Sequence, residues 1–149
     1  MTLTLAVGQK SALALRSASG QTLALTYNQT FAEGQESLTH AMQLDISLSD
    51  GARVWVLDAK FKPYVEPGEE SDDVNQMHAY HDAIIGVLKT RTVAAAWCLY
   101  AGLTDYPNRD QITYGHGMDA PIGSLCLRPG DTQTVANLRR LLSLWLAGG

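Results

Sequence analysis

The chain has 149 residues, of which 46% are hydrophobic, and its formal net charge is −4, so it can bury one core but is too short for two domains of typical size. The acidic balance excludes a protein that holds nucleic acid by net charge alone, because phosphate binding depends on clustered Lys and Arg. The apolar runs are too short or too interrupted to span a bilayer, and no leader-like segment opens the chain. We therefore expect one soluble cytoplasmic domain over residues 1–149, with no membrane partner.

The first third of the chain has the pattern of antiparallel strands. Residues 3–27 form short alternating apolar and polar runs separated by turn residues, which predicts hairpins. Residues 28–40 are polar and are expected to form a loop. The alternation resumes at residues 41–49, which predicts another strand.

A two-residue connection and an acidic loop follow. The dipeptide Asp50-Gly51 separates the strand at 41–49 from another over residues 52–61, and a connection this short joins neighbouring strands. Residues 62–73 are rich in proline, glycine and acids, which cannot continue a strand and indicate an exposed loop.

The second half alternates helices with buried strands. Ser71 and the acids after it favour a helix start, which predicts a helix over residues 72–90. The almost wholly apolar run at 93–102 suits a strand covered on both faces. The remaining expected elements are a loop over 104–121, a short strand over 122–130 and an amphipathic helix over 132–146. This order predicts an α/β or α+β sandwich with a mixed sheet.

Asp58 and Lys60 are the first candidates for chemistry. Side chains two apart in a strand share a face, so both project together, and Asp45 lies on the preceding strand across the short turn. Two ionised, partly buried carboxylates repel each other unless a cation lies between them. We therefore predict a Mg²⁺ site, with Mn²⁺ as a substitute, formed by Asp45, Asp58 and the backbone carbonyl of Ala59.

This predicted site suits phosphodiester hydrolysis. The metal ion would acidify a bound water, while Lys60 would orient that water or neutralise charge in the transition state. Gln76 and Tyr80 are four residues apart and so share a face of the next helix, from which they can support the site through hydrogen bonds.

The segments "QLDISL", "WVLDAKFK" and "NQMHAYHDAI" occur in the order found in a known family. The chain resembles the PD-(D/E)XK nuclease superfamily, and in particular the C-terminal nuclease domain of DUF2357 proteins, which are similar to the nuclease subunits of McrBC-type restriction systems. The resemblance implies a restriction endonuclease-like α/β fold, with a three-layer core, a mixed central sheet flanked by helices, and an N-terminal β-hairpin region before it.

The same resemblance implies a Mg²⁺-dependent DNA endonuclease of restriction or antiphage defence. Asp45, Asp58 and Lys60 would take the catalytic positions, with Gln76 and Tyr80 in the Q-x-x-x-Y helix motif. The implied partners are DNA and an AAA+ NTPase of the McrB type, and a homodimer is left open. In the resembled fold a helix precedes the first core strand, so we expect the single domain to be a fragment, to receive that helix from another chain, or to manage without it.

Several alternatives remain open from the sequence. Asp45, Asp58 and Lys60 can instead form a surface salt bridge at a sheet edge. His78 and His81, with Asp82, can be transition-metal ligands, although packing or hydrogen-bonding roles are favoured because no third ligand is evident. Asp73 is interpreted as a helix-start acid. The whole domain can also be a catalytically inactive assembly or DNA-binding module, or a nuclease directed at RNA or at particular nucleic-acid structures.

Overall fold

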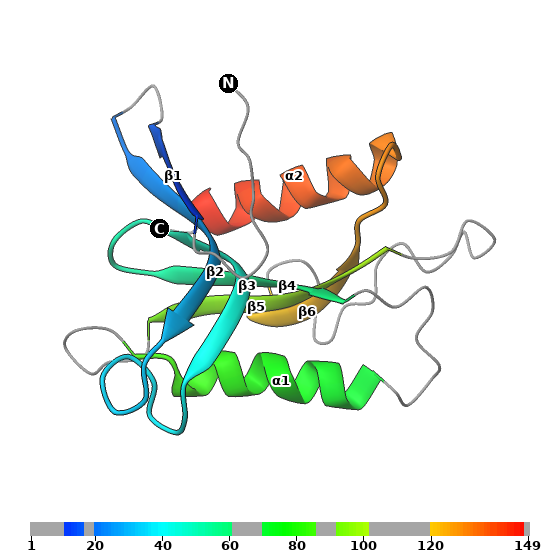
Figure 1. The fold of residues 1–149 in the computed structure, drawn as a ribbon. Coiled ribbons are helices and arrows are strands. Elements are labelled where there is room, and N and C mark those ends of the chain that lie inside the picture. Colours follow the sequence, from blue (N-terminus) through cyan, green and yellow to red (C-terminus); the bar gives the residue numbers. More distant parts are fainter. Residues whose placement is uncertain (1–10, 17–19, 61–69, 86–91, 102–119, 148–149) are drawn as a thin grey trace.

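The computed structural model describes residues 11–16, 20–60, 70–85, 92–101 and 120–147, and its elements are labelled in Figure 1. In chain order they are β1 (Ser11–Arg16), β2 (Thr22–Phe31), β3 (Met42–Ser49), β4 (Val54–Lys60), α1 (Glu70–Ala83), β5 (Val93–Tyr100), β6 (Ile122–Cys126) and α2 (Thr132–Ala147).

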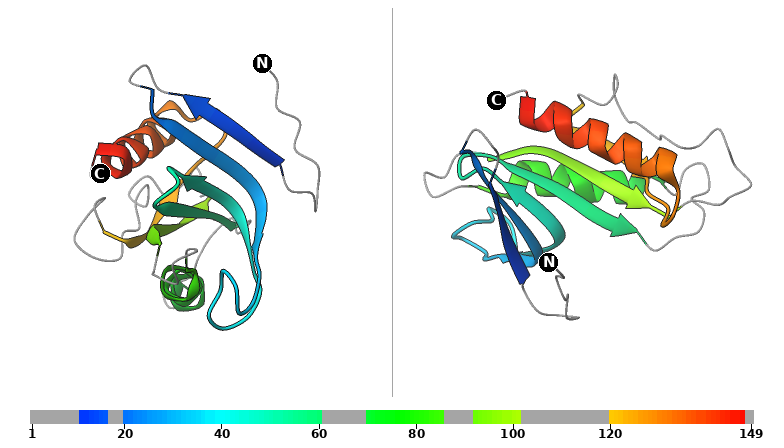
Figure 2. Two further views of the ribbon diagram at one scale, coloured as in Figure 1. Left: turned by 90° about the vertical axis from the view of Figure 1, so that its left-hand side faces the viewer. Right: turned by 90° about the horizontal axis from the view of Figure 1, so that it is seen from above.

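The six described strands form one mixed sheet in the order β1-β2-β3-β4-β5-β6. Neighbours from β1 to β4 are antiparallel, whereas β4, β5 and β6 run parallel. Parallel neighbours need a crossover, which α1 provides between β4 and β5. Helix α1 covers one face of the sheet and α2 the other, as Figures 1 and 2 show. The predicted three-layer α/β fold is confirmed, and the N-terminal hairpin is the β1–β2 edge of the same sheet.

Each face of the sheet has its own apolar core because side chains alternate along β4. Val56 lies in the cluster under α1, whereas Trp55 and Leu57 lie in the cluster under α2. On the α2 side, Trp145 stacks on Trp55 with ring centroids 6.5 Å apart. The alternation also places Asp58, two residues after Val56, on the α1 face.

Both cysteines of the chain, Cys98 and Cys126, are buried and free. Cys98 lies in the cluster under α1. Within the described residues, no helix combines the length and the apolar character needed to cross a membrane.

Several element boundaries differ from the sequence prediction: the strand expected over residues 122–130 ends at Cys126, helix α1 begins at Glu70 and β4 at Val54, and two others have a clear cause in the fold. The loop expected from residue 28 begins later, because β2 continues to Phe31, whose side chain is buried against the α1 core. The helix expected to reach residue 90 ends at Ala83, where Ile85 donates its backbone amide to the carbonyl of Glu36 at 2.9 Å. Both differences arise from partners distant in sequence. Residues 86–90 of that helix, the run at 3–7 and most of the two long loops lie outside the described residues.

Candidate active site

The two predicted carboxylates lie on neighbouring central strands. The antiparallel pairing of β3 with β4 reaches Ile46 and Leu57, and one further step in this register sets Asp45 opposite Asp58. The amide of Ala59 donates a hydrogen bond to Oδ2 of Asp45 at 2.9 Å. Strand β4 is paired on both sides and Asp58 is only 5% exposed. Asp58 therefore lies inside the sheet and is buried, so the alternative of a surface salt bridge at a sheet edge is wrong.

Lys60 connects Asp58 to helix α1. Its ammonium forms an ion pair with Oδ2 of Asp58 and donates to Oε1 of Gln76 at 2.5 Å. Burial lowers the pKa of Lys60, but the hydrogen bond and charge of Asp58, together with the charge of Asp73, outweigh it and leave the pKa raised. The ammonium therefore stays charged at neutral pH.

Gln76 and Tyr80 continue this chain of polar contacts, one helical turn apart on the same face of α1 as predicted. Nε2 of Gln76 donates to the Tyr80 hydroxyl at 2.5 Å, and that hydroxyl donates to the backbone carbonyl of Gln43 on β3 at 3.4 Å. Burial, with the charge of Asp58 added, raises the pKa of Tyr80 to about 12. The phenol is thus a neutral donor that ties the helix to β3.

The electrostatics around Asp58 favour a cation beside it. Burial raises the pKa of Asp58, the charges of Asp45 and Asp73 raise it further, and Lys60 opposes them only in part. The net effect is a buried carboxylate whose charge is not fully balanced. A divalent cation shared with Asp45 would supply the missing positive charge.

The available donors fit a hard cation that keeps water ligands. Among the residues that the structure describes, no group of three or more His, Cys, Asp and Glu side chains can hold a metal. Two carboxylates supplemented by a backbone carbonyl and water are the kind of site that Mg²⁺ uses. The alternative of a transition-metal site has no such support, because His81 is engaged with its neighbour Asp82, with Nδ1 and Oδ1 3.0 Å apart.

The structure adds Asp73 to the neighbourhood of the predicted residues. This carboxylate is buried on α1, with Oδ1 3.8 Å from the Lys60 ammonium, while Oδ2 accepts a hydrogen bond from Tyr100 at 2.8 Å. Its interpretation as only a helix-start acid is therefore incomplete. The signal that could have found it is spacing, because Asp73, Gln76 and Tyr80 follow the i, i+3, i+7 pattern of one helix face.

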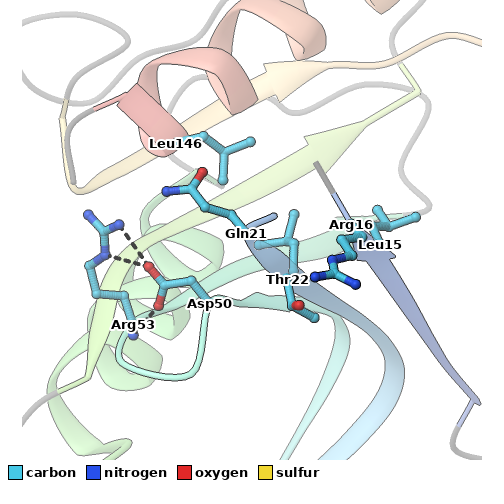
Figure 3. Close-up of a pocket in the computed structure, with 8 residues that line it drawn as sticks. Leu15, Arg16, Gln21, Thr22, Asp50, Arg53 and Leu146 are labelled. Carbon is cyan, nitrogen blue, oxygen red and sulfur yellow. Dashed lines mark hydrogen bonds and ion pairs between the residues drawn. The ribbon is translucent and has the colours of Figure 1, made fainter. Parts of the chain in front are cut away.

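Two hollows in the described part of the chain lie away from these residues. One of about 470 Å³ is lined by β1, β2, the β3–β4 turn and the end of α2, and Figure 3 shows the Asp50–Arg53 ion pair on its wall. Another of about 390 Å³ is almost wholly apolar and lies between the sheet and α2. Neither is lined by the predicted site residues. A site that acts on a long polymer needs an open edge rather than an enclosed cavity, so this separation does not count against it.

Fold and site together define an α/β domain with a restriction endonuclease-like core. The chain belongs to the PD-(D/E)XK nuclease superfamily, whose family model matches residues 1–105. The predicted superfamily is thereby confirmed.

No curated protein matches the chain. Among solved structures it is similar to a chain in the refined half-complex from the tetradecameric assembly of Thermococcus gammatolerans McrB AAA+ hexamers with bound McrC, with 16% identity and a TM-score of 0.44. The match covers 80% of this chain and 28% of that one, so this chain spans little more than a quarter of its length.

Proposed function

We propose that this domain is a nuclease that hydrolyses DNA phosphodiester bonds with the help of a divalent cation, Mg²⁺ with Mn²⁺ as a substitute, in restriction or antiphage defence. The observation that carries the proposal is the buried Asp58 carboxylate opposite Asp45 and in contact with Lys60. Membership of the PD-(D/E)XK nuclease superfamily supports nuclease chemistry.

Asp45, Asp58 and the carbonyl of Ala59 would hold the cation. When bound, such an ion polarises a phosphoryl oxygen and lowers the pKa of a water molecule. The bond from the Ala59 amide leaves the other oxygen of Asp45 available as a ligand. The alternate side-chain direction along β4 keeps Asp58 and Lys60 on the same face, toward the substrate.

Lys60 would act on the reacting phosphate. Its charged ammonium can neutralise the negative charge that develops on the phosphorane-like transition state or orient the attacking water. Oε1 of Gln76 accepts a hydrogen bond from the ammonium, and Nε2 of Gln76 donates one to Tyr80, so the two helix residues limit where the ammonium can move. They are positioning residues in this proposal.

The net charge of −4 suggests that another protein supplies much of the grip on DNA. We include an AAA+ NTPase of the McrB type as that partner, because of the resemblance to McrC-like and DUF2357 nuclease domains. A homodimer is a second arrangement that would bring two sites to the two DNA strands.

Plasmid cleavage with Mg²⁺ or Mn²⁺ tests the proposal. We expect Asp58→Ala and Lys60→Met each to lower the cleavage rate by about 10²-fold or more. The matched control is Asp72→Asn, which removes an exposed acid one position before Asp73 on α1 and should cleave like the unmodified chain. Equal, background-level cleavage by the unmodified chain and Asp58→Ala in every metal would contradict catalysis by this domain.

Calorimetric titration with Mn²⁺ separates the enzyme from a catalytically inactive module of the same fold. The enzyme proposal requires binding that Asp45→Ala and Asp58→Ala abolish. Absent binding, or binding unaffected by either change, supports the inactive module. Cleavage of single-stranded RNA or branched DNA in preference to duplex DNA would redirect the substrate while leaving the metal site in place.

A further inference from the structure

Asp73 lies beside the candidate site and faces residues of β4 and β5. It lies on the first half of α1, its side chain is buried, and its two oxygens face different partners. Oδ2 accepts the hydroxyl hydrogen bond of Tyr100, and Oδ1 faces the Lys60 ammonium at 3.8 Å. Tyr100 is also the residue paired with Lys60 across the parallel β4–β5 ladder. The Asp73 carboxylate is thus held beside Lys60 by the strand next to it.

Lys60 would have to change partners when a cation binds. Its ammonium now lies against Oδ2 of Asp58, which is a predicted metal ligand. A divalent ion on Asp58 repels this ammonium, and a largely buried ammonium without a counter-charge is costly. A second carboxylate must therefore receive it if Lys60 is to stay charged near the reacting phosphate.

Asp73 is the carboxylate placed to do so. A normal charge-assisted hydrogen bond between nitrogen and oxygen is about 2.8 Å long, so a shift of about 1 Å would bring Lys60 from 3.8 Å into contact with Asp73. Gln76 can follow this shift because it already contacts the ammonium. Burial and the hydrogen bond to Asp73 raise the pKa of Tyr100, so the phenol keeps the proton that orients the carboxylate.

We propose that Asp73, oriented by Tyr100, is a positioning residue that takes over the Lys60 ammonium when a divalent cation occupies Asp45 and Asp58. This inference rests on the proposed function. It differs from a role as a metal ligand, since both Asp73 oxygens face groups of the protein and no three-residue metal group occurs among the described residues.

A double-mutant cycle tests this exchange, the transfer of the Lys60 ammonium from Asp58 to Asp73. Mn²⁺ binding is measured by calorimetry for the unmodified chain, Asp73→Asn, Lys60→Met and the double variant. Without Asp73 the ammonium stays on Asp58 and competes with the metal. We therefore expect Asp73→Asn to weaken Mn²⁺ binding about tenfold, the lower end of the effect of removing a partner of a metal ligand. In the Lys60→Met background, the same substitution should have little effect, because no ammonium remains to be placed. Equal losses in both backgrounds, or no loss in either, overturn the inference.

Two further variants protect the test against misfolding. Tyr100→Phe retains the Asp73 charge but releases its orientation, so it should weaken Mn²⁺ binding less than Asp73→Asn does, and only while Lys60 is present. Asp72→Asn is the matched control and should bind Mn²⁺ normally. If Asp73→Asn fails to fold, Tyr100→Phe in the two backgrounds decides the same question, and an equal effect in both again overturns the exchange.

Cleavage kinetics supply an independent readout. A positioning role predicts that Asp73→Asn at saturating Mn²⁺ lowers kcat about tenfold or more while KM for DNA changes little. A change in KM alone contradicts the exchange. If the unmodified chain binds no Mn²⁺, the proposed function fails and the exchange falls with it; if the unmodified chain binds and the cycle shows no coupling, the exchange alone is wrong.

Discussion

The backbone amide of Ala59 donates to Oδ2 of Asp45 at 2.9 Å, and this bond carries the pairing of β3 with β4 beyond Ile46 and Leu57, the last regular pair. A side-chain oxygen here replaces the backbone acceptor of a normal ladder. Asp45 is therefore a link between two strands as well as a candidate metal ligand.

The two roles of Asp45 can be separated with two substitutions. Asp45→Asn keeps an oxygen that can accept from Ala59, so its free energy of unfolding should stay close to that of the unmodified chain. Asp45→Ala loses the acceptor and should be destabilised by about 1 kcal/mol, the usual net value of one hydrogen bond. Both should lose Mn²⁺ affinity, because neither has the charge. Urea denaturation and calorimetry measure the two effects, and equal stability of all three proteins would contradict the structural role.

The buried position of Asp58 should lower the stability of the folded chain at neutral pH. The pKa of Asp58 is raised above 3.8 by burial and by the Asp45 and Asp73 charges, against the opposing effect of Lys60. A carboxyl whose pKa is higher in the folded chain binds more protons there, so its contribution to stability falls as pH rises from the unfolded value of 3.8 through the folded value. Asp58→Asn should thus be at least as stable as the unmodified chain at neutral pH.

The pH dependence supplies the check on Asp58→Asn. Its advantage should shrink as the pH approaches the unfolded pKa, where the native carboxyl also becomes neutral. Denaturation of both proteins at several pH values, with Asp72→Asn as the exposed control, measures this. An Asp58→Asn variant that is markedly less stable at neutral pH would show that the Lys60 pair outweighs burial.

The raised pKa of Tyr80 predicts that the folded chain loses stability at alkaline pH. The pKa of Tyr80 is raised to about 12 from 10.0, and burial raises that of Cys98 to about 12 from 9.0. The unfolded chain therefore releases these protons first, and stability falls as pH rises through the unfolded values and on toward the folded ones. Tyr80→Phe should lose less stability between neutral pH and pH 11 than the unmodified chain. Phenolate absorbance during a pH titration gives a second measurement. Compared with the unmodified chain, Tyr80→Phe should lack only one tyrosine that ionises late, at high pH.

Local pattern was sufficient for much of the fold and for the place of the predicted residues. The connection before β4 spans residues 50–53 rather than the predicted dipeptide, but it leaves the same residues facing one another, so a period of two still places Asp45, Asp58 and Lys60 on one face. Helical spacing does the same for Gln76 and Tyr80.

The missed features depend on long-range neighbours. The relation of Asp73 to Lys60 requires Tyr100, and this tyrosine reaches Lys60 only because β5 lies parallel to β4. Strand order among distant segments has no local signal. The same reason explains why the helix end at Ala83 was missed, since the amide of Ile85 is satisfied by Glu36.

The close packing of Gly123 against Trp97 cannot be predicted from the spacing of residues in the sequence. Gly123 is paired with Trp97 across β5 and β6, and a Cβ at this position would lie 2.7 Å from the Trp97 ring, which is wholly buried. Gly123→Ala should therefore cost about 1–3 kcal/mol, as overpacked cores do. Trp97→Phe should make room, so adding Gly123→Ala to it should cost less than the same change in the unmodified chain. Urea denaturation of the four proteins measures this coupling, and additive losses would exclude the clash.

Asn28 interrupts the regular pairing of β2 with β3. Its φ of 53° is in the left-handed region, and the β2–β3 pairing passes from Tyr27 with Ile46 to Gln29 with Leu44, leaving Asn28 opposite Asp45 without a ladder pair. Left-handed backbone is open to Gly and tolerated by Asn, but costs other residues about 1–2 kcal/mol, and β-branched ones suffer most.

Two substitutions at Asn28 separate backbone from side chain. Asn28→Gly should keep the stability of the unmodified chain within a few tenths of a kcal/mol, whereas Asn28→Val should lose about 1–2 kcal/mol. Because Asp45 lies opposite, the strained valine should also weaken Mn²⁺ binding, while Thr30→Val, an exposed change further along β2, should affect neither property. If Asn28→Gly binds Mn²⁺ as poorly as Asn28→Val, the Asn28 side chain rather than the backbone conformation supports the site.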